Sequence, residues 1–320
     1  MSTVEKKDKI KILFMGTPEF SCPGLQSLIN EKEFEVVAVF TQADKKVGRK
    51  QEIQMPAVKK LALKYNIPIF QANKIKDEVE NIKNIAPDLI VVIAYGKIIP
   101  QSILDIPKYS CINVHGSLLP KYRGASCLNA PILNGDKETG ITIMKMEAGL
   151  DTGPILRQFK IELDDKETLE NLHDKLSNLA KDNLVNTLKD WIEGKIEEQK
   201  QDDSKSSYVS IIKKEDGKIS LNKSAIEIER MIRAFNPWPG TYGYLNDKAL
   251  KIIEAKVEEE KIENEENKEV GEFYLENKNL YLKCGQNSLH ILKLQLPGKR
   301  PMTSKELLNG NKEIIGSILK

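Results

Sequence analysis

Short apolar runs alternate with segments of helical periodicity from residue 10 to residue 191 of this 320-residue chain. The apolar runs predict strands at 10–15, 35–40, 67–70, 88–94, 111–115 and 140–146. Apolar residues at helical spacing predict helices at 19–30, 56–65, 75–85, 125–133 and 167–191. Strands that alternate with helices pair in parallel, and unbroken Val/Ile runs such as 88–94 are typical of strands covered on both faces. The sequence therefore predicts an α/β domain with a Rossmann-like parallel sheet.

The pattern changes after a polar segment rich in Ser, Asp and Lys at residues 199–207. Beyond it the sequence predicts one helix and then short strands without helices between them: 225–235 for the helix, and 242–245, 250–255, 273–275, 280–284 and 289–294 for the strands. Such closely spaced strands predict a small antiparallel β-barrel of the OB-like kind. We therefore expect a first domain at 1–198, a linker at 199–210 and a second domain at 211–320.

Composition places the chain among globular proteins. Hydrophobic residues make up 40% of the chain and charged residues 30%, which excludes the fibrous and broadly disordered classes. The first nine residues are polar, and no apolar run approaches the ~18 residues of a membrane-spanning helix. We therefore expect neither a signal peptide nor a membrane span, and a cytoplasmic location.

The four cysteines, Cys22, Cys111, Cys127 and Cys284, form no C-x-x-C pair and have no histidine at ligand spacing. This spacing supports neither a zinc site nor a disulfide framework. We expect four reduced thiols that pack as small buried hydrophobes, and no bound metal.

Charge is distributed unevenly within the second predicted domain. Residues 206–320 hold 19 Lys/Arg and 17 Asp/Glu, whereas residues 254–272 alone hold 9 acids and 3 lysines. The rest of that domain is therefore basic, which suits a polyanionic partner. From charge alone, an ordinary solvated surface fits equally well.

The turn after the first predicted strand, residues 15–20 (M-G-T-P-E-F), lies where a Rossmann protein binds pyrophosphate. It lacks the second and third glycines of the dinucleotide fingerprint, and Pro18 and Glu19 occupy the place that a phosphate would approach. The turn therefore disfavours NAD and similar cofactors. The carboxyl ends of the parallel strands still predict a ligand crevice at this edge of the sheet.

Asn113 and His115 are two residues apart on a predicted strand, so their side chains project from the same face. They lie at the carboxyl end of the strand, next to a loop that begins with Gly116. A single histidine is more often structural, and His173 and His290 fit that interpretation. The strand-end position, the neighbouring amide and the glycine favour a functional role for His115.

Asp151 follows the strand that ends at Met146 and lies between Gly149 and Gly153, 36 residues after His115. Flanking glycines allow backbone to approach a ligand closely, although Asp-Thr-Gly is also an ordinary turn sequence. A carboxylate that orients an imidazole, beside an amide, is suited to acyl transfer without a protein nucleophile. It provides a base for the attacking group and hydrogen-bond donors for the oxyanion.

Three segments resemble the signature of the formyltransferases that use 10-formyltetrahydrofolate: 112–120 (I-N-V-H-G-S-L-L-P), 123–125 (R-G-A) and 149–153 (G-L-D-T-G). Among these formyltransferases, the methionyl-tRNA formyltransferase family is the one that four further segments resemble: 16–20 (G-T-P-E-F), 41–50 (T-Q-A-D-K-K-V-G-R-K), 92–96 (V-I-A-Y-G) and 233–239 (R-A-F-N-P-W-P). This likeness covers nearly the whole chain. It implies transfer of a formyl group from 10-formyltetrahydrofolate, as a co-substrate, to the α-amino group of methionyl-initiator tRNA for the initiation of protein synthesis.

The resemblance also implies roles for individual residues. Asn113, His115 and Asp151 match the catalytic triplet of the superfamily, and the loop of Ser117, Leu118, Leu119 and Pro120 matches the folate-binding loop. Phe20 matches a contact with the methionyl side chain, and Arg49 with Lys50 matches a basic loop that meets the tRNA. No permanently bound cofactor, no membrane and no obligate protein partner are implied, and we expect a monomer.

The chain departs from the family pattern beside the folate loop. Residues 126–129 read Ser-Cys-Leu-Asn where the family usually has Ala-Pro-Ile-Gln, and Tyr122 replaces the commoner tryptophan. Three other functions stay open from the residues: formyl transfer to a small amine such as glycinamide ribonucleotide or an amino-sugar nucleotide, hydrolysis of the folate, and plain folate or RNA binding. The basic loop and the C-terminal barrel disfavour the first, and the pairing of His115 with Asp151 disfavours the last.

Overall fold

The computed structural model describes residues 8–47, 51–258, 262 and 265–320. The chain divides into two compact units, and each gathers parts of the chain that are distant in sequence. The first unit contains residues 1–127, 138–162 and 173–210, and the second contains 128–137, 163–172 and 211–320. Arg49 and Lys50 lie outside the described residues.

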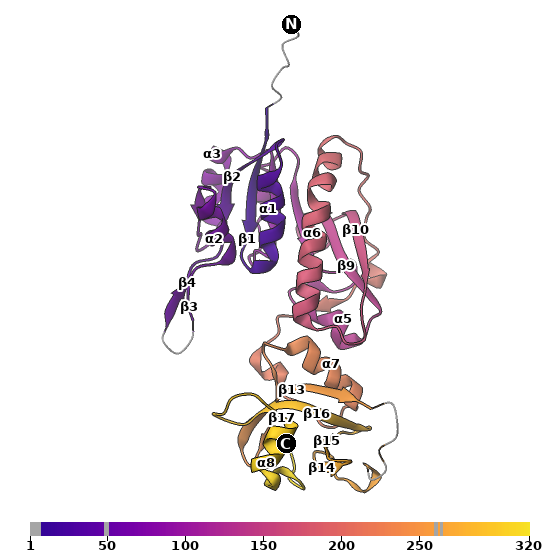
Figure 1. The fold of residues 1–320 in the computed structure, drawn as a ribbon. Coiled ribbons are helices and arrows are strands. Elements are labelled where there is room, and N and C mark those ends of the chain that lie inside the picture. The colour runs from indigo at the N-terminus through magenta and orange to yellow at the C-terminus, as the bar shows by residue number, and fades with distance from the viewer. Residues whose placement is uncertain (1–7, 48–50, 259–261, 263–264) are drawn as a thin grey trace. The chain divides into compact units, whose positions relative to one another are not determined.

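The first unit is built on a seven-stranded sheet with the order β10-β9-β7-β6-β1-β2-β5 (Figure 1). Its strands are β1 (Ile10–Gly16), β2 (Phe34–Phe40), β5 (Ile69–Phe70), β6 (Leu89–Ile93), β7 (Cys111–His115), β9 (Glu138–Lys145) and β10 (Ile155–Glu162). The pairs β1–β2, β1–β6, β2–β5 and β6–β7 are parallel, which confirms the predicted Rossmann-like sheet. The prediction did not include β10, and β9 and β10 run antiparallel because a short loop at 146–154 joins them as neighbours.

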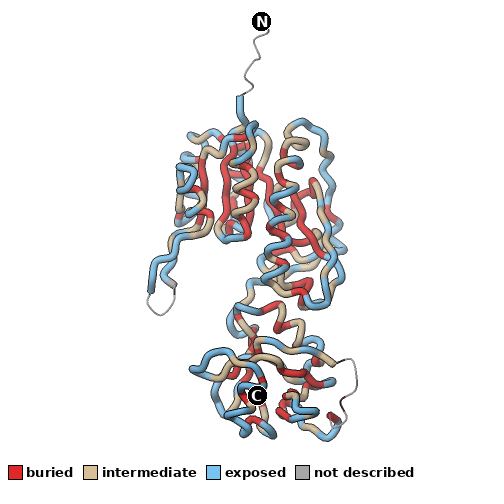
Figure 2. The backbone as a smooth tube through the Cα atoms, viewed as in Figure 1, coloured by how far each residue is buried: buried red, intermediate tan, exposed pale blue. Residues whose placement is uncertain are grey.

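The central strands of this sheet form the core of the first unit. All five residues of β6 and of β7 are buried, which the unbroken apolar run of β6 predicts, and Figure 2 shows the buried residues concentrated in the strands of this unit. Helix α1 approaches the sheet closely because it contains Gly24. A Cβ at that position would lie 2.6 Å from Cδ1 of Ile93 on β6.

The predicted helices of the first unit are present with different end residues, and a short helix at 101–104 was not predicted. They are η1 (Glu19–Ser21), α1 (Cys22–Asn30), α2 (Ala57–Lys64), η2 (Ile75–Glu78), α3 (Val79–Ile85), α4 (Gln101–Leu104) and most of α6 (Leu169–Ile192). Two short strands, β3 (Lys45–Val47) and β4 (Glu52–Gln54), form a hairpin at the basic loop, where the sequence analysis predicted no strand.

Residues 199–210, which their polarity indicated as a linker, belong to the first unit. We call this segment the strap. It contains η3 (Asp203–Lys205) and β11 (Tyr208–Val209), and β11 pairs in parallel with β8 (Arg123–Gly124). Gln201, Asp203 and Ser207 of the strap hydrogen-bond to residues of the loops at 122–124 and 151–153, whereas its other polar residues, such as Ser204 and Lys205, are exposed. Composition does not distinguish the first kind of polar residue from the second.

The second unit contains an antiparallel sheet of six strands, which confirms the predicted antiparallel β architecture. Its elements are η4 (Lys214–Gly217), α7 (Ala225–Phe235), β12 (Thr241–Leu245), β13 (Lys248–Val257), η5 (Glu265–Asn267), β14 (Phe273–Glu276), β15 (Asn279–Lys283), β16 (Ser288–Gln295), β17 (Met302–Thr303), α8 (Ser304–Gly310) and η6 (Lys312–Ile314). Helix α7 and the five predicted strands are confirmed, whereas β17 and α8 were not predicted. The OB-like closure of the barrel stays a prediction, since the observed strand order β12-β13-β16-β15-β14, with β17 on β16, is open.

Helix α5 (Asn129–Asn134) also belongs to the second unit and is shorter than the predicted helix at 125–133. Residues 125–128, where the helix was predicted to begin, form a turn instead, and the N–H of Ala125 donates to the carbonyl oxygen of Val209 in the strap. Asn129 Nδ2 donates a hydrogen bond to the carbonyl oxygen of Ala234 on α7, at 2.7 Å. Part of the family departure at 126–129 is therefore a packing contact within the second unit.

Cys111, Cys127 and Cys284 are buried as expected, whereas Cys22 is only half-buried. Within the part of the chain that the structure describes, no helix is both long and apolar enough to cross a membrane.

Candidate active site

Asn113 and His115 lie at the end of β7, the strand beside β6 in the sheet of the first unit. Both side chains are nearly buried, with exposed fractions of 9% and 6%. Among the residues described in the structure, the Asn113 amide has no hydrogen-bond partner. An almost buried amide without a partner is a donor and acceptor available to a ligand.

The imidazole of His115 is held on one side by a backbone carbonyl. Its Nε2 lies 2.9 Å from the carbonyl oxygen of Tyr122. Because a carbonyl only accepts hydrogen bonds, Nε2 carries the hydrogen and donates it. Tyr122 has a φ of 60°, in the left-handed region that costs a non-glycine residue energy, so its surroundings fix this carbonyl in place.

Asp151 faces the other ring nitrogen of His115. Its Oδ2 lies 3.7 Å from Nδ1 of His115 and accepts a hydrogen bond of 2.8 Å from the backbone N–H of Gly124. Asp151 also has a left-handed backbone, with a φ of 55°. The structure thus brings a carboxylate and an imidazole together as two constrained groups.

The route of the chain to Asp151 differs from the sequence argument. That argument placed Asp151 after a strand ending at the same sheet edge as β7. In the structure β9 runs antiparallel to β7, and the N–H of Met146 bonds to the carbonyl oxygen of Cys111 at the start of β7. The 146–154 loop therefore begins at the far end of β7 and returns to His115.

The surroundings of His115 favour its charged form. Burial lowers the pKa of His115, but the Cys127 thiol, the Asp151 carboxylate and the Tyr122 carbonyl outweigh burial and raise the pKa to about 9. The charged imidazolium form of the ring is therefore favoured over the neutral form. A buried cation beside an unpaired amide can stabilise negative charge that develops on a substrate oxygen.

A second layer of contacts, which the sequence analysis missed, joins the strap to both site loops. Arg123 is 2% exposed, and its guanidinium donates to Gln201 Oε1 at 3.1 and 2.8 Å, to Asp203 Oδ1 at 2.7 Å and to the Tyr208 hydroxyl at 3.0 Å. The amide of Gln201 donates to the carbonyl oxygens of Asp151 at 2.8 Å and Gly153 at 2.7 Å. Nothing in the local sequence signals this, because the partners lie between about 50 and 85 residues apart.

The predicted folate loop is also fixed from beneath. Thr142 on β9 donates from its hydroxyl to the carbonyl oxygen of Ser117 and accepts from the N–H of Leu119, at 2.7 and 3.0 Å. Gln158 on β10 donates to the carbonyl oxygen of Leu119 at 2.8 Å. Leu118 and Pro120 are half-buried, whereas Ser117 and Leu119 are buried. The exposed side of this loop is therefore formed by Leu118 and Pro120.

The residues predicted to contact the methionyl side chain and the tRNA lie in η1 and in the basic loop at 41–50. Phe20 in η1 is 6% exposed, and its ring packs edge-to-face on His173 with the ring centroids 5.4 Å apart. Lys45 and Lys46 are exposed on β3, and the neighbouring Arg49 and Lys50 fall among the residues that are not described. No group of three or more His, Cys, Asp or Glu that could hold a metal is found in the described ranges.

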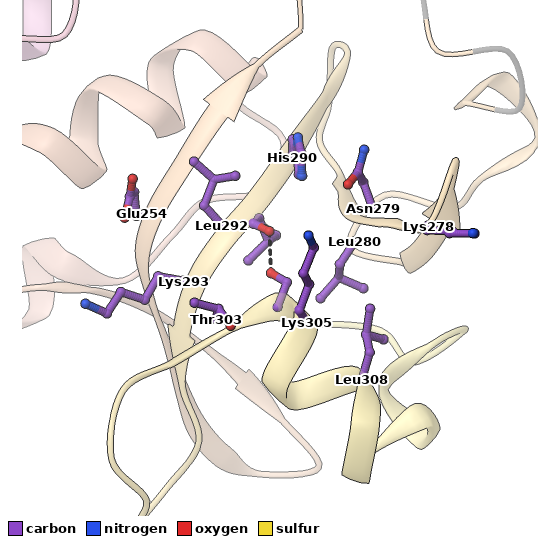
Figure 3. Close-up of a pocket in the computed structure, with 12 residues that line it drawn as sticks. Glu254, Lys278, Asn279, Leu280, His290, Leu292, Lys293, Thr303, Lys305 and Leu308 are labelled. Carbon is purple, nitrogen blue, oxygen red and sulfur yellow. Dashed lines mark hydrogen bonds between the residues drawn. The ribbon is translucent and has the colours of Figure 1, made fainter.

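The second unit contains a pocket of about 470 Å³ that none of the predicted site residues lines. Figure 3 shows it between β15, β16 and the start of α8, with Lys305 rising between Leu280 and Leu292. Lys278 and Lys293 also line it, and Glu254 is its one acidic lining residue. An open pocket with three lysines provides positive charge for an anionic partner.

Comparison with known proteins agrees with this geometry. The chain matches the family described as formyl transferase over residues 8–188 and the formyl transferase C-terminal domain over residues 211–312. It is 44% identical to the methionyl-tRNA formyltransferase of Geobacter sulfurreducens over 303 residues, which covers 94% of each chain. It is 42% identical to that of Clostridium novyi over 314 residues, which covers 97% of this chain and 100% of the relative.

Two solved structures with the same fold are described with a sugar substrate or a bound sugar nucleotide. The sugar 3N-formyl transferase WlaRD, crystallised in the presence of dTDP and 5-N-formyl-THF, has a TM-score of 0.65 and 25% identity and covers 91% of this chain and 99% of its own. The N-formyltransferase of Helicobacter canadensis, in complex with folinic acid and dTDP-3-aminofucose, has a TM-score of 0.65 and 23% identity, covers 88% of this chain and 99% of its own, and supports the fold.

Proposed function

Because this chain belongs to the methionyl-tRNA formyltransferase family, we propose that it carries the formyl group of 10-formyltetrahydrofolate to the α-amino group of methionyl-initiator tRNA. The observation that carries this proposal is 42–44% identity over 94–97% of the chain to relatives of that name. The site supports it with an amide, an imidazolium and a carboxylate at the end of β7.

In the proposed mechanism the methionyl amine attacks in its neutral form. As the new C–N bond forms, the formyl oxygen gains negative charge, which the Asn113 amide and the His115 imidazolium stabilise by donating hydrogen bonds. Nδ1 is the nitrogen of His115 that remains for this role, because Nε2 already donates to Tyr122. Asp151 stabilises the imidazolium and accepts the proton that the amine releases, directly or through water. The bond from the formyl carbon to N10 then breaks, and a proton passes to N10 of the leaving tetrahydrofolate.

The folate loop of Ser117, Leu118, Leu119 and Pro120 is proposed to line the pocket for the folate. Its anchoring by Thr142 and Gln158 supports this role, because a loop with a fixed backbone binds without losing freedom. Phe20 is proposed to contact the methionyl side chain, and Arg49 with Lys50 the tRNA. No permanently bound cofactor is part of the proposal.

The second domain, residues 211–320, is proposed to bind tRNA. The lysines around its pocket support this role, since Lys278, Lys293 and Lys305 line it and carry positive charge. We further propose that the protein is cytoplasmic, where charged initiator tRNA is found, and that it acts as a monomer.

The amino-sugar alternative has a specific observation in its favour, since one solved structure that shares the fold is described as a sugar 3N-formyl transferase. Its identity to this chain is 25%, against 42–44% for the methionyl-tRNA formyltransferases. A shared fold does not fix the substrate, whereas nearly full-length identity above 40% covers the substrate-contacting loops as well.

One experiment separates the candidates. The pure protein is incubated with 10-formyltetrahydrofolate labelled in its formyl group, and with methionyl-initiator tRNA, an amino-sugar nucleotide or neither. Label on the methionyl amine is expected. Label on the sugar would establish the small-amine function, and release of labelled formate without an acceptor would establish hydrolysis.

A further inference from the structure

We propose that Gln201 is a positioning residue for formyl transfer, which holds the loop of Asp151 so that its carboxylate faces His115. This inference rests on the proposed function and adds to it a residue outside the catalytic triplet. The chain reaches Gln201 after α6, in the strap that composition indicated as a linker.

The Gln201 amide uses all of its principal hydrogen-bonding groups in this contact. Its nitrogen donates to the carbonyl oxygens of Asp151 and Gly153, at 2.8 and 2.7 Å, and its oxygen accepts twice from Arg123. The amide orientation follows from its partners, because carbonyl oxygens only accept and a guanidinium only donates. Gln201 is 5% exposed, so no water replaces these bonds without a change in structure.

Two loops that contact His115 from opposite sides are therefore joined through one side chain. On one side lies Asp151, whose main-chain oxygen Gln201 holds. On the other lies Tyr122, whose carbonyl accepts from Nε2 of His115 and whose N–H donates to the Ser207 hydroxyl at 2.9 Å. Arg123 is the next residue along the chain. Gln201 and Ser207 thus set the two groups that hold the imidazole.

Backbone pairing with β11 makes this arrangement specific. The N–H of Arg123 donates to the carbonyl oxygen of Ser207 at 2.8 Å, and the N–H of Ala125 to that of Val209 at 3.2 Å. Gly124 has a φ of 106°, and a Cβ there would lie 2.4 Å from the carbonyl oxygen of Val209. Only glycine fits at this crossing, and its N–H is the group that binds the Asp151 carboxylate.

Asp151 needs such support because its own backbone is unfavourable. A left-handed aspartate between two glycines has little intrinsic reason to keep its carboxylate 3.7 Å from Nδ1 of His115. Loss of the Gln201 contacts is expected to let the 149–153 loop relax. The carboxylate would then stabilise the imidazolium less, and the geometry of the reacting groups would loosen.

The test compares Gln201→Met with the wild-type full-length chain. Methionine has a similar length and no hydrogen-bonding amide, so volume is nearly kept while four hydrogen bonds are lost. We expect kcat for formyl transfer to fall between tenfold and about 10²-fold, the range for misplacement of a reacting group by a distant change. The KM for 10-formyltetrahydrofolate should stay within about twofold, because the folate loop is anchored by Thr142 and Gln158 instead.

The titration of His115 distinguishes a positioning role from a merely structural one, because a general loss of stability would leave the pKa of His115 unchanged. The chain has three histidines, so ring signals of His115 can be assigned in NMR spectra of the free protein by comparison with His115→Ala. In Gln201→Met the pKa of His115 is expected to fall from the wild-type value toward that of an ordinary histidine. The alkaline limb of the kcat profile should move to lower pH with it.

Two matched glutamine variants serve as controls. Gln158→Met removes a bond to the carbonyl oxygen of Leu119 and should raise the KM for the folate while leaving the His115 titration unchanged. Gln295→Met removes a bond of 2.8 Å to the carbonyl oxygen of Lys299 in the second unit and should change neither.

If Gln201→Met folds and both the His115 titration and the pH profile match the wild type, the inference is wrong, whatever happens to kcat. If that variant does not fold, Gln201→Glu decides by the same criterion, since its carboxylate can still accept from Arg123 but has no N–H to donate to the carbonyl oxygens of Asp151 and Gly153. If the wild-type chain does not formylate methionyl-tRNA, the proposed function fails, while the titration of His115 still tests the role of Gln201.

Discussion

His115 in the first unit and the lysines around the second-unit pocket carry the same sign of charge in opposite settings. The imidazolium is 6% exposed and fixed between the Tyr122 carbonyl and the Asp151 carboxylate. Lys278 and Lys305 are exposed, and Figure 3 shows the amine of Lys278 directed outward. The first arrangement holds one charge at one place, whereas the second spreads several charges over a surface.

This difference separates two tasks that formylation of a tRNA requires. Stabilising one oxyanion needs a charge that does not move and that salt does not screen. Binding a nucleic acid backbone needs many mobile charges and depends on salt because counterions are released. Changes near His115 should therefore act on kcat and hardly on salt dependence, and changes to the basic surfaces should do the reverse.

The largest effect is expected from His115→Ala. Loss of the imidazolium removes both a donor to the oxyanion and the partner of Asp151, so kcat should fall by at least 10²-fold. Rates at saturating substrate, with a thermal melt to establish folding, give the measurement. Near-normal turnover in a folded variant would remove His115 from the mechanism.

Asp151→Asn should also lower kcat by about 10²-fold, and it adds a signature in pH. The carboxamide oxygen can still accept from the N–H of Gly124, so the loop should keep its shape. Without the carboxylate the pKa of His115 falls from about 9. The imidazolium is then lost at lower pH, and the alkaline limb of kcat should move downward. An unchanged limb would contradict the electrostatic role of Asp151.

Arg49→Ala tests the basic loop, whose tip lies outside the described residues. Hydrogen bonds to charged groups contribute about 1.5–3 kcal/mol, so the KM for charged tRNA should rise at least tenfold at unchanged folate KM. The slope of log affinity against log salt should fall by about 1. The control is Lys60→Ala, which removes an exposed positive charge from α2. Equal effects of both variants would mean that general charge, and not this loop, binds the tRNA.

The smallest effect is expected from Lys305→Gln in the second-unit pocket. A single exposed charge contributes about 0.2–1 kcal/mol, which corresponds to roughly a one- to fivefold rise in the KM for tRNA. The salt slope should again fall by about 1, and kcat should not change. Lys312→Gln, at an exposed position of η6 that does not line the pocket, is the matched control. A salt slope that is the same in both variants would exclude the pocket from the tRNA interface.

The sequence predicted those parts of the fold whose cause is local. Strand β6 was found because its apolar run is unbroken and buried on both faces, and β1, β2 and β7 because apolar residues predominate in short runs. Strand β10 was missed, since its burial alternates along an edge strand and its pattern stands out less from its surroundings. The late start of α5 was not predicted either, because the N–H of Ala125, at the predicted start, donates to Val209, which lies more than eighty positions away in the sequence.

The same distinction applies to the candidate site. Asn113 and His115 could be placed together because they share a strand face, and Asp151 because its loop resembles a family signature. Gln201 and Tyr208 carry no such signal. Their importance depends on a buried Arg123, which is visible only when distant segments are seen together.

The strap has a consequence for how domains of such proteins can be exchanged. If composition alone guided the design, a chimera with the C-terminal domain of a relative would be joined near residue 199, where the polar segment begins. That junction would bring in foreign partners for Arg123, and a buried charge that loses its partner costs about 3–5 kcal/mol. A junction after Ser210 leaves every contact of the strap with the catalytic unit from the same parent. The recombination point that preserves catalysis is thus set by an arginine almost ninety residues upstream.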